Sequence, residues 1–312
     1  MNRINRRSLL KSGAALGGAG LLLHHHAHAE PAPASASSLM LETANRFLAA
    51  LDNEQRAKAT FAFDSDERMN WHFIPKVRKG LPLREMTAYQ KHLASALLSS
   101  GLSQTGYIKA VTIMSLEDVL KTIENASDEY RNPEKYFFSI FGVPSATDPW
   151  GYRIEGHHLS QNYTVVNGKV VDGPSFFGAN PAEVRQGPRK GLRTLAAEDD
   201  LGFALIQSLD ASQRKTAVVD PTAYKDILTA ASRKAALTGQ QSGFSAANMS
   251  TKQFDALQAL LDEYARNVPG SLSERRRAQI AKAGKEILFA WSGGVDRGSP
   301  HYYLVHAPSF LI

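Results

Sequence analysis

The spacing of apolar residues predicts several amphipathic helices. In these stretches apolar positions recur every three or four residues, as they do for Leu41, Ala44, Phe47, Leu48 and Leu51. Helices are predicted over residues 39–61, 83–101, 104–126 and 190–218, with two more over 251–284.

Between the helices the pattern changes to one typical of strands. The predicted strands are residues 136–141, 152–166, 169–172, 287–291 and 301–312. Asn167-Gly168 is a strong two-residue hairpin signal. Strands and helices are segregated along the chain, which predicts an α+β fold in which an antiparallel β-sheet packs against several α-helices.

Two short segments resemble each other. Residues 51–59 read LDNEQRAKA and residues 209–217 read LDASQRKTA, and each follows an amphipathic helix. Two explanations are open. The segments are parts of an internal repeat, or each is an independent example of a common helix start with Asp as N-cap.

The first 29 residues have the features of a twin-arginine signal peptide. Arg6-Arg7 precedes an apolar run over residues 12–23, and Ala27-His28-Ala29 supplies a cleavage pattern. The run is about a dozen residues, shorter than the roughly 20 that span a bilayer, so cleavage is favoured over an uncleaved anchor. We therefore expect a signal peptide over 1–29, a disordered linker over 30–38 and a single α+β domain over 39–312.

Charge and cysteine content narrow the classes of function. The chain has a net charge of +6, and removing the four basic residues of the signal segment leaves +2. We therefore expect no nucleic-acid partner. The absence of cysteine excludes thiolate metal sites and cysteine nucleophiles. The expected partners are the twin-arginine translocation machinery and a small-molecule ligand, and the expected location is periplasmic or secreted, with no stable membrane anchor after cleavage.

A segment over residues 150–181 carries the densest set of reactive side chains. In a strand Glu155 and His157 would share one face, which makes a two-ligand half-site or an acid–base pair. Glu155, His157 and His158 are the predicted catalytic residues. A divalent metal ion is the predicted cofactor, with His72, His157 and His301 as its ligands.

Four aromatic residues are predicted to line the substrate pocket: Trp71, Trp150, Phe176 and Phe177. Core packing is the alternative role, above all for Phe176. The Asp-x-Asp spacing at residues 64–68 suits a hard cation, but a solvated turn explains it more simply. No G-x-S-x-G, G-x-G-x-x-G or P-loop motif is present, so neither a serine hydrolase nor a nucleotide-binding protein is expected.

Four motifs together resemble a known family. They are F-x-F-D-x-x-E-R-x-x-W-H-F-x-P at 61–75, W-G-x-R-x-E-G-H-H-L-S-x-N-Y-T at 150–164, G-P-x-F-F-G-A-N-P at 173–181 and H-Y-Y at 301–303. The chain resembles domain of unknown function family 3500, a group of exported proteins without an established activity. The resemblance implies a longer chain, and the apolar end at residues 310–312 leads to the same expectation of truncation.

Three hypotheses of function follow. The first is an exported metal-dependent hydrolase-like enzyme with a His/Glu site on a central strand. The second is a non-catalytic periplasmic protein that binds a small ligand or a metal in the same place. In the third, the histidines only join the sheet to the helices.

Overall fold

The computed structural model describes residues 35–171, 173–237 and 242–312, which lie in one compact unit spanning residues 34–312. The predicted signal peptide and the first part of the linker lie outside the described residues. The α+β prediction is confirmed, but the strands form two sheets rather than one. Both sheets are mostly antiparallel, and each contains one parallel pair of strands.

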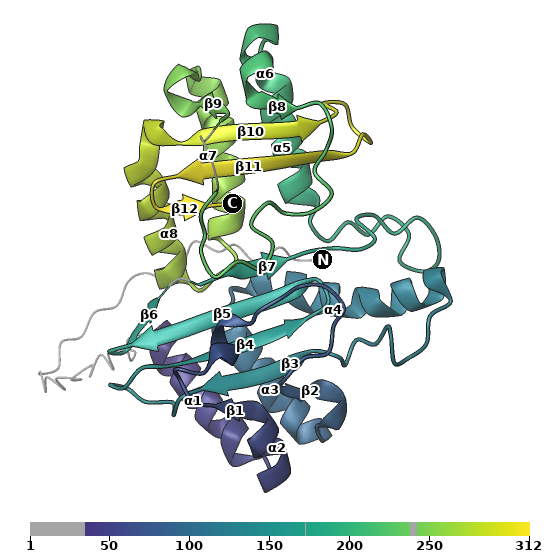
Figure 1. The fold of residues 1–312 in the computed structure, drawn as a ribbon, viewed down its shortest axis with the longest axis vertical. Helices are drawn as coiled ribbons and strands as arrows, with labels where there is room; N and C mark the ends of the chain where they lie inside the picture. Colours follow the sequence, from purple (N-terminus) through teal and green to yellow (C-terminus); the bar gives the residue numbers. More distant parts are fainter. Residues whose placement is uncertain (1–34, 172, 238–241) are drawn as a thin grey trace, which may run out of the picture. The chain divides into compact units, whose positions relative to one another are not determined.

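The first sheet and its helices come from the N-terminal half (Figure 1). The helices are α1 (Ala36–Ala49), α2 (Asn53–Ala59), α3 (Ala88–Ser100) and α4 (Gln104–Glu124), with 3-10 turns η1 (Asp66–Met69) and η2 (Leu83–Glu85). The strands are β1 (Thr60–Phe61), β2 (Leu81–Pro82), β3 (Phe137–Phe141), β4 (Trp150–Gly156), β5 (Leu159–Val166), β6 (Lys169–Val171) and β7 (Ser175–Phe177). The sheet order is β1-β3-β4-β5-β6, with β2 also on β3 and β7 also on β5.

The second sheet belongs to the C-terminal half. Its helices are α5 (Ala196–Ser208), α6 (Ala211–Ala217), α7 (Thr251–Ala265) and α8 (Gly270–Ala283), with turns η3 (Ala246–Asn248) and η4 (Gly284–Glu286). Its strands are β8 (Val218–Asp220), β9 (Phe244–Ser245), β10 (Leu288–Gly293), β11 (His301–Ala307) and β12 (Phe310–Leu311). The order is β12-β11-β10-β8, with β9 also on β10.

Several predicted boundaries are wrong. The predicted helix over 190–218 is two helices, α5 and α6, and the predicted strand over 301–312 is the hairpin β11–β12. Three further differences have a clear local cause. The Ser35 hydroxyl accepts from the amide of Ser38, so α1 starts at Ala36, inside the predicted linker. The predicted helix over 39–61 is two helices, because Asp52 and Gln55 form a capping box that starts α2. The predicted strand over 152–166 is a hairpin that turns at His157-His158.

Each sheet buries one face under its own helices. In the N-terminal half, Trp150, Tyr152 and Ile154 of β4 point into a core shared with α1, α3 and α4. In the C-terminal half, Phe289 and Trp291 of β10 point into a core that contains residues of α5 and α7. Alternate residues of each strand face the other way, so the opposite face of the first sheet carries polar residues of β4 and β5.

The two halves repeat one another element by element. Each half begins with a helix and a short capped helix, α1–α2 in the first half and α5–α6 in the second. A short strand then runs parallel to a longer strand (β1 on β3, β8 on β10), and a second short strand pairs antiparallel with the same longer strand (β2 on β3, β9 on β10). Two helices, the longer strand and a hairpin follow in the same order: α3, α4, β3 and β4–β5 in the first half, and α7, α8, β10 and β11–β12 in the second. The similarity of residues 51–59 and 209–217 is therefore part of a duplication of the whole fold.

A buried glutamine makes the same set of hydrogen bonds in both halves, which supports this interpretation. Gln90, the third residue of α3, donates to the carbonyl of Ala50 and exchanges a side-chain hydrogen bond with Gln55. Gln253 occupies the same place in α7, where it donates to the carbonyl of Ser208 and bonds Gln213. Because each glutamine also closes a capping box, two helix starts are fixed by one side chain in each half.

A buried ion cluster joins the two halves. The ammonium group of Lys109 on α4 lies 2.6 Å from Glu198 of α5 and 2.6 Å from Glu263 of α7. All three side chains are at most one-tenth exposed. A charge in such surroundings is stable only with its partners in place, so the cluster sets how the halves meet.

Candidate functional site

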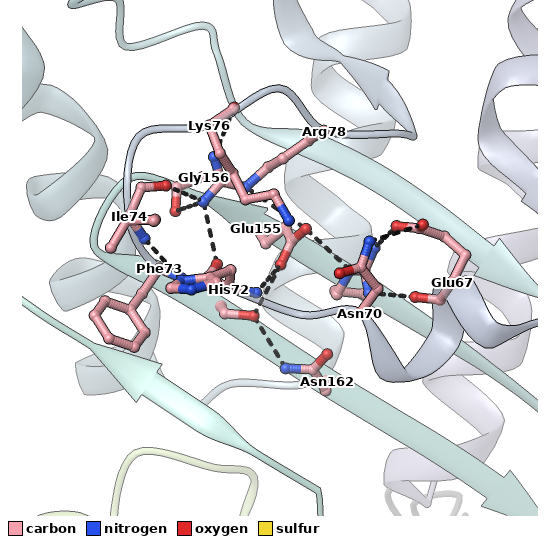
Figure 2. Close-up of polar contacts among 12 residues, drawn as sticks. Glu67, Asn70, His72, Phe73, Ile74, Lys76, Arg78, Glu155, Gly156 and Asn162 are labelled. Carbon is pink, nitrogen blue, oxygen red and sulfur yellow. Dashed lines mark hydrogen bonds and ion pairs between the residues drawn. The ribbon is translucent and has the colours of Figure 1, made fainter. Parts of the chain in front are cut away.

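A long loop covers the polar face of the first sheet. Residues 62–80 leave β1, cross over β4 and return as β2, and side chains of the sheet hold them in place (Figure 2). The carboxylate of Glu155 accepts from the backbone amide of His72 at 2.9 Å. One nitrogen of Arg78 donates to the carbonyls of His72, Ile74 and Gly156.

Two carboxylates and two guanidinium groups form the centre of this contact. Arg153 lies 2.6 Å from Glu67 and 3.3 Å from Glu155, and Arg78 lies 3.5 Å from Glu155. The Glu155 side chain is 2% exposed. Burial raises the pKa of Glu155 above its ordinary value, and Arg153, the His72 amide and Arg78 act against that rise. The group is charge-balanced and closely bonded, which is the arrangement of a structural anchor.

His72 therefore contributes its backbone rather than its ring to Glu155. Its Nδ1 accepts from the amides of Phe73 and Ile74, at 2.9 and 3.3 Å. Burial lowers the pKa of His72, and Lys76 and Arg78 lower it further. A ring that accepts two backbone hydrogen bonds at Nδ1 is held as the neutral imidazole with its proton on Nε2.

The two adjacent histidines form the β4–β5 turn. Gly156 pairs with Leu159 across it, and His158 adopts a left-handed conformation with φ of 59°. The prediction that Glu155 and His157 share a strand face is wrong, because the strand has ended at Gly156. Glu155 points into the loop contact, and His157 points to helix α4 instead.

His157 is paired with a carboxylate that sequence reasoning missed. Its Nδ1 lies 2.6 Å from Oε1 of Glu117, and both side chains are at most 10% exposed. Arg131 lies 3.0 Å from the same nitrogen and binds Glu124 through two hydrogen bonds. Nδ1 can either donate to Glu117 or accept from Arg131, and the shorter contact of 2.6 Å assigns it as the donor to Glu117. Arg131 then makes no hydrogen bond to Nδ1 and lies 3.9 Å from the Glu117 carboxylate as its cation. The Nε2 atom has no hydrogen-bond partner in the described part of the chain.

His158 has a different environment. Its ring stacks on that of His157 with centroids 3.9 Å apart, and its backbone is held by Phe73 and Gly178. Burial lowers the pKa of His158 to about 4, with His157 and Arg131 contributing. His158 is therefore neutral at neutral pH and fixes the shape of the turn.

A pocket of about 780 Å³ opens beside the Glu117–His157 pair. Both residues line it, together with residues of α2, β2, the segment 75–80 and the loop before β3. Tyr136, which also lines it, donates its hydroxyl to the carbonyl of His157 at 2.8 Å and so fixes the turn from behind. The pair is thus buried on one side and faces an open volume on the other.

The second half works as an internal comparison. Its equivalent turn, between β11 and β12, is Pro308-Ser309 instead of His157-His158. Helix α4 has 21 residues and its counterpart α8 has 14, so Glu124 lies in an added segment of α4 and Arg131 in the loop after it. The two halves share a scaffold. Among the described residues, the β11–β12 turn of the second half carries no equivalent of the Glu117–His157 pair, and its His301–Asp199 pair lies on β11 and α5 instead.

The predicted metal ligands do not come together. His301 lies on β11, where its Nε2 is 3.0 Å from Asp199 and its ring stacks on Trp291. His72 and His157 lie in the first half, where the ring of His72 accepts from the amides of Phe73 and Ile74 and that of His157 contacts Glu117. Over residues 35–171, 173–237 and 242–312, no three His, Cys, Asp or Glu side chains are grouped closely enough to hold a metal ion.

The four predicted pocket aromatics lie elsewhere. Trp150 is completely buried in the first core, because its place on β4 faces the helices. Phe177 packs against the same core, and Phe176 stacks on Phe73 at 4.3 Å. Trp71 lies beside Phe73, with ring centroids 6.3 Å apart. None of the four is among the residues that line the 780 Å³ pocket.

One signal in the sequence points to Glu117. In α4 the buried stripe is Gly106, Lys109, Ala110, Ile113, Leu116, Glu117 and Leu120, so two charged residues occupy apolar positions. Charged side chains on a buried stripe require partners, and both of these have them. No comparable pattern marks Arg131 or Arg78, which lie in loops.

The fold and the site define an α+β protein of two related halves, with an acid–base pair and a pocket in the first half. The chain belongs to the family described as Protein of unknown function (DUF3500), whose model matches residues 34–312. No curated protein and no solved structure matches the chain significantly.

Proposed function

We propose that this protein is an exported hydrolase-like enzyme in which His157 acts as the general base. The observation that carries the proposal is the 2.6 Å contact of Glu117 with His157 Nδ1 at the wall of a 780 Å³ pocket. A carboxylate on Nδ1 fixes the tautomer that leaves Nε2 as a proton acceptor. Glu117 is the positioning residue, and His157 is the residue that would take a proton from water.

The proposed reactive centre is the Glu117–His157 pair and no longer includes Glu155, which the sequence suggested. Glu155 is replaced by Glu117, since Glu155 is engaged by Arg78, Arg153 and the His72 amide. The metal-dependent form of the hypothesis receives no support from the donor geometry. Export rests on Arg6-Arg7, the apolar run and the Ala27-His28-Ala29 pattern. In the part of the chain that the structure describes, none of the helices has the length and apolar character to cross a bilayer.

The test is a screen of chromogenic esters, amides and phosphomonoesters with the purified wild type and three variants. We expect turnover of one class, reduced about 10²- to 10⁴-fold in His157→Asn, the usual range for removing a general base. His301→Asn is the matched control, because it removes a histidine–carboxylate pair that does not line the pocket. Wild-type turnover in His157→Asn would refute the assignment.

Glu117→Gln tests positioning separately from folding. In ¹⁵N spectra of the imidazoles we expect His157 to carry its proton on Nδ1 in the wild type and to populate both tautomers in Glu117→Gln. A variant that folds normally but keeps the single tautomer would contradict the role of Glu117.

The second candidate is a non-catalytic exported protein that binds a small ligand. The extensive partnering of the groups around Glu155 favours it, because those side chains need no substrate to balance their charges. Ligand binding without turnover of any of the three substrate classes would select this candidate over the enzyme.

A further inference from the structure

The charges around the pocket are not balanced. Six cationic and three anionic side chains line it, with Glu85, Glu117 and Glu129 as the anions. Glu85 is paired with Lys58, and Glu129 is paired with both Arg84 and Lys135. Every lining carboxylate is therefore engaged by a residue of the protein.

Two of the lysines that line the pocket have no carboxylate partner among the described residues. Lys76 and Lys79 are both exposed, and neither ammonium group has an ion-pair partner within residues 35–171, 173–237 and 242–312. Val77, between the two lysines, is 94% exposed, and Tyr130, which also lines the pocket, is 54% exposed. Cations and apolar side chains are thus presented to the same volume.

Hydrogen bonds from the Arg78 side chain fix the backbone of the segment that carries these lysines. Arg78 lies between them, and its guanidinium donates to the carbonyls of His72, Ile74, Lys76 and Gly156. Its side chain is 3% exposed and lies beside Glu155. The backbone is therefore fixed before a ligand arrives, which reduces the entropy lost on binding.

We propose that the pocket takes a small organic anion, a carboxylate or a phosphate ester, with an apolar body. Lys76 and Lys79 hold the negative group, while Val77 and Tyr130 contact the apolar part. This inference rests on the proposed function for the location of the site, and it adds the chemical class of the ligand.

Two dyes that differ in one anionic group provide the test. 8-Anilinonaphthalene-1-sulfonate carries a sulfonate, and N-phenyl-1-naphthylamine is the same framework without it. We expect the wild type to bind the sulfonate dye roughly tenfold more tightly than Lys76→Ala/Lys79→Ala does, and to bind the neutral dye as that variant does. The difference should shrink in 0.5 M salt, since exposed charges are screened at about 3–5 Å there.

Lys215→Ala/Lys282→Ala is the matched control, because it removes two exposed lysines outside the pocket. It should bind both dyes as the wild type does. Equal affinity of the wild type and Lys76→Ala/Lys79→Ala for the sulfonate dye would overturn the inference, and so would preference of the wild type for the neutral dye. Displacement by benzoate or by phenyl phosphate then distinguishes a carboxylate from a phosphate ligand.

His157→Asn separates this inference from the proposed function. It should bind the sulfonate dye normally, because His157 is assigned to proton transfer rather than to charge recognition. Selective dye binding without turnover would leave the ligand class standing and remove the enzyme. Turnover of neutral substrates alone would support the enzyme and overturn the anionic ligand class.

Discussion

His158 shows how burial and backbone conformation act on one residue. Its φ of 59° lies in the left-handed region, which costs a side chain other than Gly, Asn or Asp some free energy. Its ring is half-buried and packs on that of His157, and its pKa is lowered to about 4. A chain that keeps a strained, neutral histidine at a turn depends on the neighbours that hold it.

The lowered pKa of His158 predicts a pH-dependent stability. Between about pH 6.5 and 4 the unfolded chain binds a proton at this histidine and the folded chain does not, so stability falls as the pH falls through this window. The loss is at most roughly 3 kcal/mol. His158→Asn, which tolerates the left-handed conformation, should unfold with a weaker dependence on pH over this range.

Urea midpoints followed by circular dichroism between pH 4 and 7 measure this effect. His92→Asn is the control, because His92 is exposed on α3 and should leave the wild-type pH dependence intact. The same slope in the wild type and in His158→Asn would show that the turn does not hold a neutral ring.

At the scale of elements, ion pairs hold the loop over residues 62–80 on the sheet, in addition to the stacking of Phe73 on Phe176. Arg153 of β4 donates to the Glu67 carbonyl at 2.7 Å and to its carboxylate at 2.6 Å. Strand β4 thereby faces two ways: one side enters the apolar core, and the other fixes the loop that forms a wall of the pocket.

Arg153→Met should be strongly destabilising. It leaves Glu67 without its cation and Glu155 with Arg78 alone, and breaking one side of a buried ion pair costs about 3–5 kcal/mol. Guanidinium-induced unfolding measures the loss, and hydrogen exchange should show faster exchange over residues 62–80. Arg277→Met removes an exposed pair with Asp262 and should cost far less. Equal losses in the two variants would contradict the anchoring role.

At the scale of the whole molecule, duplication separates scaffold from function. The capping boxes, the paired glutamines and the strand order occur in both halves, so they belong to folding. The histidine turn and the extension of α4 occur in one half, which is why the site is assigned there. Lys109, buried between Glu198 and Glu263, connects the site-bearing half to its counterpart.

The proposed export route also concerns the whole chain. Arg6→Lys/Arg7→Lys should leave uncleaved protein in the cytoplasm of the native host, because the signal is recognised through both arginines. Fractionation with immunoblotting measures this, and Arg3→Lys should be exported normally. Export of the double variant at the wild-type level would rule out the twin-arginine route.

Local patterns in the sequence determined the elements. Periodicity predicted α3, α4, α7 and α8, because each has an apolar stripe. A side-chain cap also marks the start of α3, α4 and α7, whereas α8 begins after Pro269 without one. Asn167-Gly168 predicted the β5–β6 hairpin, where both residues have positive φ. The repeated Leu-Asp-x-x-Gln-Arg segments carried the trace of a duplication that covers the whole fold.

Only the tertiary structure decided which reactive groups meet. Glu117 and His157 are 40 residues apart, and their contact depends on where α4 lies against the β4–β5 turn. The alternation of a strand predicts that Glu155 and His157 share a face, but a turn at His157-His158 separates them, and neither residue of this two-residue turn is Gly or Asn. Sequence spacing determines neighbours within an element, whereas packing of distant elements determines which charges share a buried site, and that packing is cooperative over the whole core.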